Sequence, residues 1–145
     1  MKELTFKKVE LEALNKLLLS FKLKGKPSRL RMRIVRLVQE TMDEFKKDHH
    51  RLIDEYALKD DKGDFVLIKK EYNGEMQEFH DFDDEQGFKK EYATLNSELF
   101  IIDTEKYKEE LFVILTAIDE NEEVLSGQEA IIHDLVYEKI SDALA

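Results

Sequence analysis

The chain of 145 residues contains no cysteine, and this absence excludes several kinds of chemistry. Without thiols the protein cannot form disulfides, hold zinc through thiolates or use a cysteine nucleophile. Proline occurs once and glycine five times, so few residues would interrupt a helix. The longest apolar run, residues 111–115, is far shorter than the roughly 20 residues of a transmembrane helix. The first residues also lack the apolar run of a signal peptide, so we expect neither membrane insertion nor secretion by that route.

The patterns of common catalytic and metal sites are missing as well. There is no glycine-rich phosphate loop, no nucleophile elbow and no H-E-x-x-H motif. Asp81, Asp83 and Glu85 begin like a calcium loop, but the glycine and the final glutamate that such a loop needs are out of place. His49 and His50 are adjacent, so on a helix they point about 100° apart and cannot share a metal ion. We therefore expect no catalytic residues, no metal, no cofactor and a non-enzymatic function.

What the sequence does contain is a strong asymmetry of charge. The first 70 residues hold 18 basic and 12 acidic residues, a net charge of +6, whereas the last 75 hold 5 basic and 21 acidic residues, a net charge of −16. Residues 13–39 contain eight basic residues and no acidic one. Such an asymmetry indicates an electrostatic contact, either between the two halves of the chain or with a partner.

The basic segment, residues 13–39, provides the first candidate site. Arginines in the first turns of a helix oppose its macrodipole, yet together with the free N–H groups there they favour an anion. The candidate anion- or partner-binding residues are Lys22, Lys24, Lys26, Arg29, Arg31, Arg33 and Arg36. Three interpretations stay open: a contact with the chain's own acidic half, an acidic protein surface, or nucleic acid. Nucleic acid is the least favoured, because the net charge of −10 repels DNA and Phe21 is the one aromatic residue of the segment that could stack on a base.

The second candidate surface is acidic. Its residues are Asp119, Glu120, Glu122 and Glu123. A row of carboxylates can imitate the phosphates of DNA and occupy the basic cleft of an enzyme, but the same row is also typical of a solvated turn between helices. A second acidic run, residues 81–85, is placed where acids stabilise the first turn of a helix.

Apolar residues at spacings of three and four predict a mainly helical α+β protein, with four to five helices around one long central helix. The longest stripe predicts a helix over residues 28–58, and its central members Leu37, Val38, Met42 and Phe45 should be almost fully buried. Shorter stripes predict helices from about residues 8, 83, 103 and 126. We expect the last two to form a helical hairpin, and we expect one domain over residues 1–145.

Local signals place the turns and strands. Leu4 and Phe6 alternate with polar residues, as in a short strand, and residues 65–68 followed by an Asn73-Gly74 turn predict a small β-hairpin. Residues 100–102 form another short apolar segment that fits a strand. Asp103 and Ser126 have the character of helix N-caps, the second with Glu129 in a capping-box pattern.

Three stretches resemble a family of small phage and prophage proteins of Gram-positive hosts, catalogued as a domain of unknown function. They are Lys2-Glu3-Leu4-Thr5-Phe6-Lys7-Lys8-Val9-Glu10-Leu11, Leu23-Lys24-Gly25-Lys26-Pro27-Ser28-Arg29 and Leu125-Ser126-Gly127-Gln128-Glu129-Ala130. The resemblance implies a phage-encoded protein of the host cytoplasm or the virion, and it brings no catalytic residues.

Together with the missing catalytic motifs, the resemblance favours a protein that acts by protein–protein contact, in virion or tail assembly or as a structural accessory. Its partner would be a phage structural protein or a host protein. One alternative is host takeover by an acidic inhibitor of a host or defence enzyme, and a weaker one is nucleic-acid binding through residues 13–39. A homo-oligomer is expected if the long helix extends beyond the helices that cover it.

Overall fold

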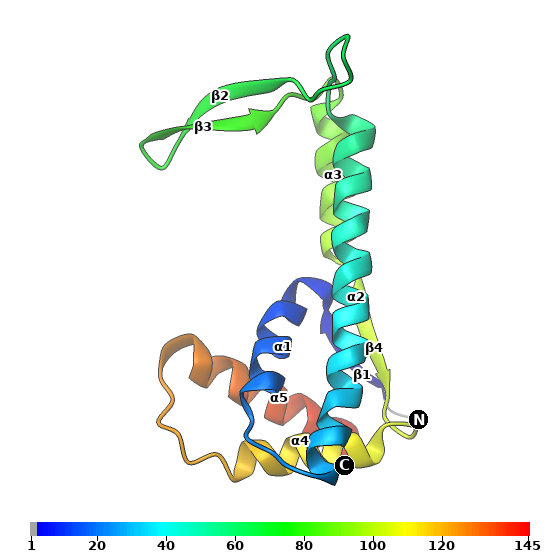
Figure 1. Ribbon diagram of the computed structural model, residues 1–145, viewed down its shortest axis with the longest axis vertical. Coiled ribbons are helices and arrows are strands. Elements are labelled where there is room, and N and C mark those ends of the chain that lie inside the picture. Colours follow the sequence, from blue (N-terminus) through cyan, green and yellow to red (C-terminus); the bar gives the residue numbers. More distant parts are fainter. Residues whose placement is uncertain (1–2) are drawn as a thin grey trace. The chain divides into compact units, whose positions relative to one another are not determined.

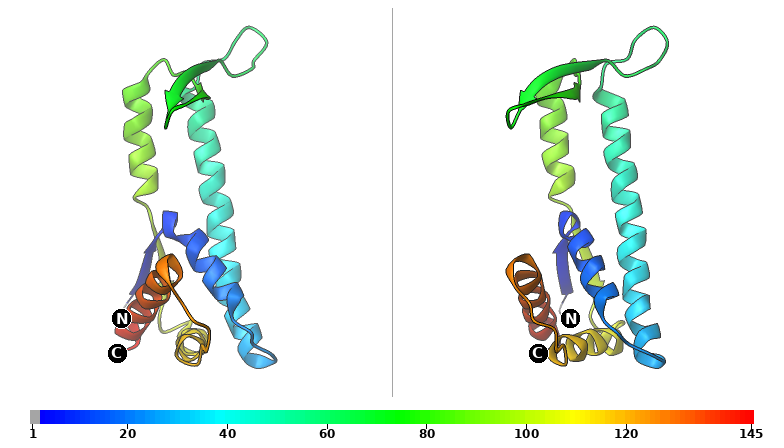
Figure 2. Two further views of the ribbon diagram at one scale, coloured as in Figure 1. Left: turned by 90° about the vertical axis from the view of Figure 1, so that its left-hand side faces the viewer. Right: turned by 60° about the vertical axis from the view of Figure 1, so that its left-hand side comes forward.

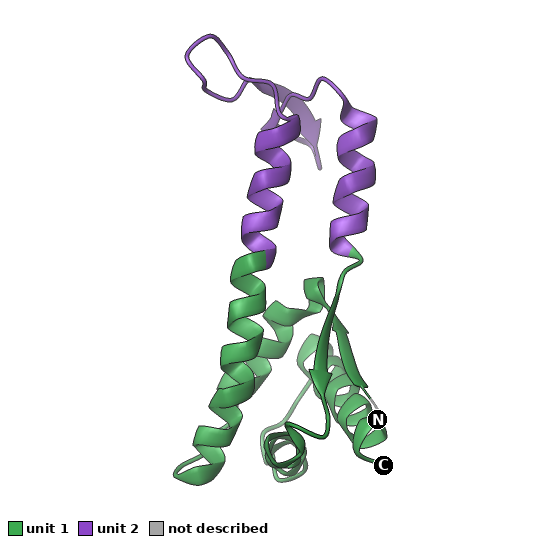
Figure 3. Ribbon diagram, turned by 90° about the vertical axis from the view of Figure 1, so that its right-hand side faces the viewer, with its two compact units in different colours: residues 1–44, 97–145 green, residues 45–96 purple. Residues whose placement is uncertain are grey.

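The computed structural model describes residues 3–145. It divides into two compact units, drawn in different colours in Figure 3: unit 1 contains the residues up to Glu44 and from Ser97 onward, and unit 2 contains Phe45–Asn96. Five α-helices and two small antiparallel sheets occur within residues 3–145. This confirms the mainly helical α+β class with one long helix. None of the described helices combines the length and hydropathy needed to cross a membrane.

Unit 1 contains a two-stranded sheet made from distant parts of the chain (Figure 1). Strand β1 (Glu3–Lys7) pairs antiparallel with β4 (Leu99–Asp103), so that Leu4 lies opposite Ile102 and Phe6 opposite Phe100. These four side chains are buried, whereas their neighbours along each strand are more exposed. The alternation of apolar and polar residues therefore decides which face of the sheet joins the core. Both strands were predicted, but their pairing was not.

Helices cover that sheet. After a 3-10 turn, η1 (Lys8–Glu10), come α1 (Leu11–Ser20) and, late in the chain, α4 (Lys108–Asp119) and α5 (Gly127–Leu144). Helix α5 contacts α1, α4 and β1, as the orange-to-red ribbon of Figures 1 and 2 shows. The packing of α4 against α5 confirms the predicted C-terminal helical hairpin. The largest fully buried side chains of this core include Phe6, Leu11, Leu18, Ile34, Leu111, Ile114 and Ile140.

The beginnings of α4 and α5 differ from the prediction. The Oδ1 of Asp103 accepts the N–H groups of Glu105 and Lys106, but these belong to a turn, and α4 begins only at Lys108. Ser126 is the N-cap of α5, but its side chain accepts no capping hydrogen bond, so the predicted capping box is wrong. Gly127 has a φ of 59°, and this left-handed first position departs from the geometry in which an N-cap oxygen meets the third N–H group of the helix.

The long helix, α2 (Lys26–Tyr56), begins two residues earlier than expected, with Pro27 in its first turn. In the part of α2 that belongs to unit 1, the buried apolar residues are Leu30, Ile34, Val35 and Val38, at most 3% exposed. Burial of Val38 is therefore confirmed. The same prediction is wrong for Leu37, Met42 and Phe45, which are only half-buried.

The reason lies in the position of the core along α2. The spacing of Ile34, Val35 and Val38 keeps one narrow face of the helix against the core of unit 1, and Leu37 packs beside that face, partly buried. Phe45 already belongs to unit 2. There Leu52 and Ala57 are the only two residues that are buried. A continuous apolar stripe thus passes from a region with many packing partners into one with few.

Unit 2 contains the rest of α2, helix α3 (Glu85–Asn96) and the hairpin of β2 (Leu67–Tyr72) and β3 (Glu75–His80). The hairpin turn has φ angles of 53° at Asn73 and 81° at Gly74, as a type I′ turn requires. The hairpin is thereby confirmed, although β2 begins two residues later than predicted. Leu99, which continues the apolar stripe of the helix predicted from about residue 83, belongs instead to β4.

Ring contacts take the place of a larger apolar core in unit 2. The ring centroids of Tyr56 and Phe88 lie 6.1 Å apart and those of His49 and Tyr92 5.4 Å apart, so aromatic pairs join α2 to α3. Phe82 stacks on Phe88 with a centroid separation of 4.1 Å. His49 is therefore a half-buried packing residue, in line with its place on the apolar stripe.

We predict that Ile34→Ala lowers the free energy of unfolding by about 2–5 kcal/mol, because Ile34 is almost fully buried in the core of unit 1. Met42→Ala removes a side chain of similar size from a half-buried site on the same helix, so its cost should be clearly smaller. Urea unfolding followed by circular dichroism measures both. An equal or larger loss for Met42→Ala would contradict the burial pattern described for α2.

Candidate functional site

The structure divides the seven candidate cations of the basic segment into three groups, and the first consists of Arg31 alone. This side chain is turned inward and only 7% exposed. Its Nη1 donates hydrogen bonds to the carbonyl oxygens of Leu18 (2.9 Å) and Phe21 (2.7 Å), and its Nη2 donates to the Oγ of Ser28 (3.1 Å). Carbonyl groups at the end of a helix have no N–H partner within that helix. Arg31 therefore completes the C-terminus of α1 and does not face a partner.

The second group pairs with acidic residues of α4. The Nζ of Lys26 lies 2.9 Å from the Oε1 of Glu109, and the Nη1 of Arg33 lies 3.4 Å from the Oε2 of Glu110. Glu110 is 5% exposed. Lys26 and Arg33 therefore contact the chain's own acidic half, which is the first of the three interpretations of the basic segment. The hydrogen bond from Lys26, then its charge and that of Arg33, lower the pKa of Glu109 below its ordinary value.

The third group is exposed to solvent. Lys22 and Lys24 lie in the linker between α1 and α2, and Arg29 and Arg36 lie on α2. Within residues 3–145 none of these four side chains has an acidic partner within ion-pair distance. Together with Lys16 of α1, which is also exposed and has no ion-pair partner in the described residues, they are the part of the basic segment that remains available for another molecule.

The acidic candidate surface lies at the end of α4 and in the connection to α5. Asp119 is the last residue of α4, and Glu120, Glu122 and Glu123 follow it. All four are exposed, and within the described residues none forms an ion pair. No group of three or more histidines or acidic residues in residues 3–145 has the arrangement of a metal site.

A groove of about 400 Å³ lies between the start of α2 and α4, within unit 1. We call it the α2–α4 groove. Its apolar lining consists of Leu23, Pro27, Leu30, Phe112, Val113 and Ala117. Lys26, Glu109 and Glu120 supply charge along it. Sequence reasoning missed this groove; the available signal was Phe112, which follows the buried Leu111 in the chain and is 46% exposed.

A second surface that sequence reasoning missed is the β2–β3 hairpin of unit 2. Leu67, Tyr72 and Met76 are 49%, 57% and 66% exposed. The register places Glu71 opposite Met76 and Tyr72 opposite Glu75, so Leu67 and Met76 share one face and Tyr72 lies on the other. Each strand has a single hydrogen-bonded neighbour. The hairpin thus presents apolar side chains on both faces.

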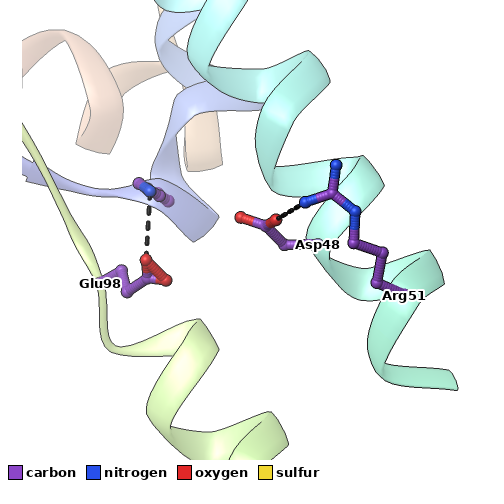
Figure 4. A network of polar contacts seen from close by, with 4 residues as sticks. Asp48, Arg51 and Glu98 are labelled. Atoms are coloured by element: carbon purple, nitrogen blue, oxygen red, sulfur yellow. Dashed lines mark hydrogen bonds and ion pairs between the residues drawn. The ribbon is translucent and has the colours of Figure 1, made fainter. Parts of the chain in front are cut away.

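Two further ion pairs lie outside the basic segment (Figure 4). The Nζ of Lys8 lies 3.3 Å from the Oε1 of Glu98, and the backbone N–H of Lys8 also donates to the carbonyl oxygen of Glu98. Together they join the residues that flank β1 and β4. Arg51 pairs with Asp48 one turn earlier on α2, at 3.3 Å, an exposed helix pair of the kind that contributes little to stability.

The chain belongs to a family described as "Protein of unknown function (DUF1617)", whose model matches residues 2–144. This confirms the part of the predicted resemblance that concerns a domain of unknown function. A search of curated proteins and a search of solved structures found no match.

We predict that Arg31→Ala lowers the free energy of unfolding by about 3 kcal/mol, because a hydrogen bond from a charged donor contributes about 1.5–3 kcal/mol and its loss leaves buried carbonyl groups unpaired. Arg29→Ala is the matched control: Arg29 is exposed and has no ion-pair partner in residues 3–145, so the change should stay within about 0.5 kcal/mol. Chemical denaturation of the two variants measures the difference. Similar losses in both would show that Arg31 does not hold the end of α1.

We also predict that Lys26→Met raises the pKa of Glu109 towards its ordinary value, because the largest cause of the lowered pKa is removed. A carboxyl group with a lowered pKa in the folded state stabilises the fold above its ordinary pKa, and this contribution is lost as the pH falls through the lowered value. Carboxyl carbon shifts in an NMR titration report the pKa directly. Lys24→Met serves as the control and should leave the pKa of Glu109 unchanged.

Proposed function

We propose that this is a phage-encoded, non-enzymatic protein that acts by protein–protein contact in virion or tail assembly, or as a structural accessory. The observation that carries the proposal is the β2–β3 hairpin, which has apolar side chains on both faces and only one neighbour for each strand. The partner is a structural protein of the particle or a host protein. The place of action is the host cytoplasm or the virion.

The hairpin has the physical properties of a contact element. A two-stranded hairpin alone is marginally stable in water. The unpaired edges of its strands are templates for further strand pairing. A partner that covers Leu67, Tyr72 and Met76 removes apolar area from water, which contributes roughly 25 cal/mol per Å².

A second candidate function has its own observation. Asp119, Glu120, Glu122 and Glu123 are exposed and without ion-pair partners in residues 3–145. This supports an acidic inhibitor of a host or defence enzyme, including one that imitates DNA. Nucleic-acid binding through residues 13–39 ranks third, because Arg31 faces inward and Lys26 and Arg33 are paired with Glu109 and Glu110.

We predict that a phage lacking this gene releases fewer complete particles, and that the wild-type gene restores their number. The double variant Tyr72→Asp/Met76→Asp should fail to restore it, because two carboxylates replace the exposed apolar contacts of the hairpin. Gln77→Asp is the matched control: it places a carboxylate in the same hairpin at a polar, exposed position and should restore the wild-type yield. Electron microscopy and plaque titres measure the outcome.

Two results would contradict this proposal. Circular dichroism first tests whether the double variant folds. If it folds and restores complete particles, then the hairpin is not the surface that contacts the partner. If particles form normally without the gene and growth fails only in hosts with a defence system, then inhibition replaces assembly as the function.

A further inference from the structure

We infer that the outer edge of strand β4 in unit 1 binds an extended segment of a protein partner, which pairs antiparallel with β4 and carries a basic residue beside Asp103. This inference goes beyond the proposed function, which rests on the hairpin of unit 2. It gives the protein a second contact surface, in a different compact unit.

The register of the β1–β4 sheet decides which backbone groups of β4 point outward. The N–H of Lys8 donates to the carbonyl oxygen of Glu98, so these two residues form a hydrogen-bonded pair of the antiparallel ladder. Hydrogen-bonded and non-hydrogen-bonded pairs alternate along such a ladder. In the register of β1 and β4, the pairs that contain Leu99 and Ile101 are therefore non-hydrogen-bonded ones. The N–H and C=O groups of Leu99 and Ile101 consequently point away from β1.

The two outer edges of this sheet differ in what pairs with them. On the β1 edge, α5 contacts β1, and the Nζ of Lys139 donates to the outward carbonyl oxygen of Thr5 over 2.7 Å (Figure 1). On the β4 edge, the outward backbone groups of Leu99 and Ile101 have no hydrogen-bond partner within residues 3–145. Unpaired groups along a strand edge are a template for another strand. The β4 edge is thus the side of the sheet that is open to strand addition.

The side chains of β4 favour a strand with alternating apolar residues as the occupant. Leu99 and Ile101 are 51% and 52% exposed, whereas Phe100 and Ile102 are 7% and 2% exposed. Because side chains alternate along a strand, Leu99 and Ile101 share the solvent-facing side of the sheet. Apolar β-branched residues of an added strand would cover them in cross-strand pairs. In this mode of binding the backbone hydrogen bonds give affinity and the alternate side chains give specificity.

Two carboxylates at one end of the sheet define the charge of the occupant. The register places Glu3 directly opposite Asp103, and both side chains are exposed. Neither has an ion-pair partner within residues 3–145. Like charges directly opposite one another in a sheet are unfavourable, so a lysine or arginine of the added strand beside Asp103 would offset their repulsion. Antiparallel pairing is slightly more stable per residue than parallel pairing, and in that direction the basic residue precedes the two apolar ones along the partner chain.

A second copy of the chain is a weaker occupant than a different protein. Strand β4 (Leu99–Asp103) contains no basic residue, so a second β4 paired with the first would bring no cation to Asp103. Each copy also has a net charge of −10, so two copies repel one another at a distance. A different protein with a basic extended segment has neither disadvantage.

The test uses a fluorophore-labelled peptide with the core sequence Lys-Thr-Val-Thr-Val. In antiparallel pairing its lysine lies opposite Asp103 and its two valines lie opposite Ile101 and Leu99. Fluorescence anisotropy with the full chain should give a Kd on the order of 100 µM. A peptide with glutamate in place of the lysine should bind about fivefold more weakly, because it adds a third carboxylate at that end of the sheet.

Methylated peptides separate strand addition from a simple apolar contact. In the antiparallel register the N–H groups of both valines point at β4, whereas those of both threonines point away from it. Methylation of both valine nitrogens removes two hydrogen bonds and should weaken binding at least about tenfold. Methylation of both threonine nitrogens is the matched control, because it changes the same number of atoms and should leave the Kd within about threefold.

Variants of the protein locate the binding. Ile101→Pro removes an outward N–H of β4 and keeps the ladder to β1, as proline does on edge strands, and should weaken binding of the lysine peptide at least about tenfold. Thr5→Pro is the matched control: it removes an outward N–H on the β1 edge and should leave the affinity within about twofold. The hairpin variant Tyr72→Asp/Met76→Asp should bind the peptide normally, which separates this inference from the proposed function.

Amide hydrogen exchange, followed by NMR, reports the paired backbone groups directly. At a peptide concentration of about ten times the Kd, the amide protons of Leu99 and Ile101 should exchange about tenfold more slowly than in the free protein. The amide proton of Thr5, on the opposite edge of the sheet, should exchange at an unchanged rate.

Each of the following results would overturn the inference. Equal binding of the two methylated peptides would exclude strand addition, and normal binding by Ile101→Pro would exclude β4. Equal Kd values for the lysine and glutamate peptides would exclude a basic occupant. A dimer in size-exclusion chromatography with light scattering that Ile101→Pro dissociates would identify a second copy as the occupant. If Ile101→Pro does not fold, the methylated peptides and the hydrogen exchange of Leu99 decide the question by themselves.

Discussion

The arrangement of unit 1 depends on one interaction, the hydrogen bonds of the Arg31 guanidinium to the end of α1. Phe21 follows α1 with an extended backbone, so the last carbonyl groups of the helix have no continuing N–H partners. Arg31 donates to the carbonyl groups of Leu18 and Phe21, which precede it by 13 and 10 residues. These bonds close the linker that contains Lys22, Leu23 and Lys24. The contact that stabilises the fold therefore also places the cations and part of the floor of the α2–α4 groove.

The position of Arg31 explains how one basic segment can serve two purposes. A cation at the C-terminal end of a helix is stabilised by the helix dipole. Arg31 therefore lies buried beside carbonyl groups, and within residues 3–145 it has no carboxylate partner at ion-pair distance. Lys26 and Arg33 are instead held by Glu109 and Glu110 of α4. After these internal contacts are made, the cations of the segment that have no acidic partner within residues 3–145 are Lys16, Lys22, Lys24, Arg29 and Arg36. The number of charges in the sequence thus overstates the charge that a partner can meet.

The sequence could predict features that depend on local patterns, but not those that depend on contacts between distant residues. Periodic apolar residues and the Asn73-Gly74 pair predicted the helices and the hairpin, because these depend on local spacing and turn geometry. The pairing of β1 with β4 and the inward turn of Arg31 depend on contacts between distant residues, which no local pattern contains. Burial likewise depends on contacts with distant residues. Phe45 lies on the apolar stripe and was therefore predicted to be buried, but it is only half-buried because unit 2 supplies few neighbours. The α2–α4 groove was invisible because it lies between two segments about 80 positions apart in the chain.

The uneven burial has a consequence for the way the protein would behave in an assembly. Unit 1 holds a contiguous apolar core, whereas unit 2 buries only Leu52 and Ala57 and leaves the β2–β3 hairpin largely exposed. Regions with few buried contacts open at a lower free energy than a protein's core. A partner that binds the hairpin only when β2 and β3 are paired stabilises the paired form. This stabilisation grows with the logarithm of the partner's concentration. The order of the hairpin would then depend on the partner, while the fold of unit 1 and its groove would already be complete before any partner binds.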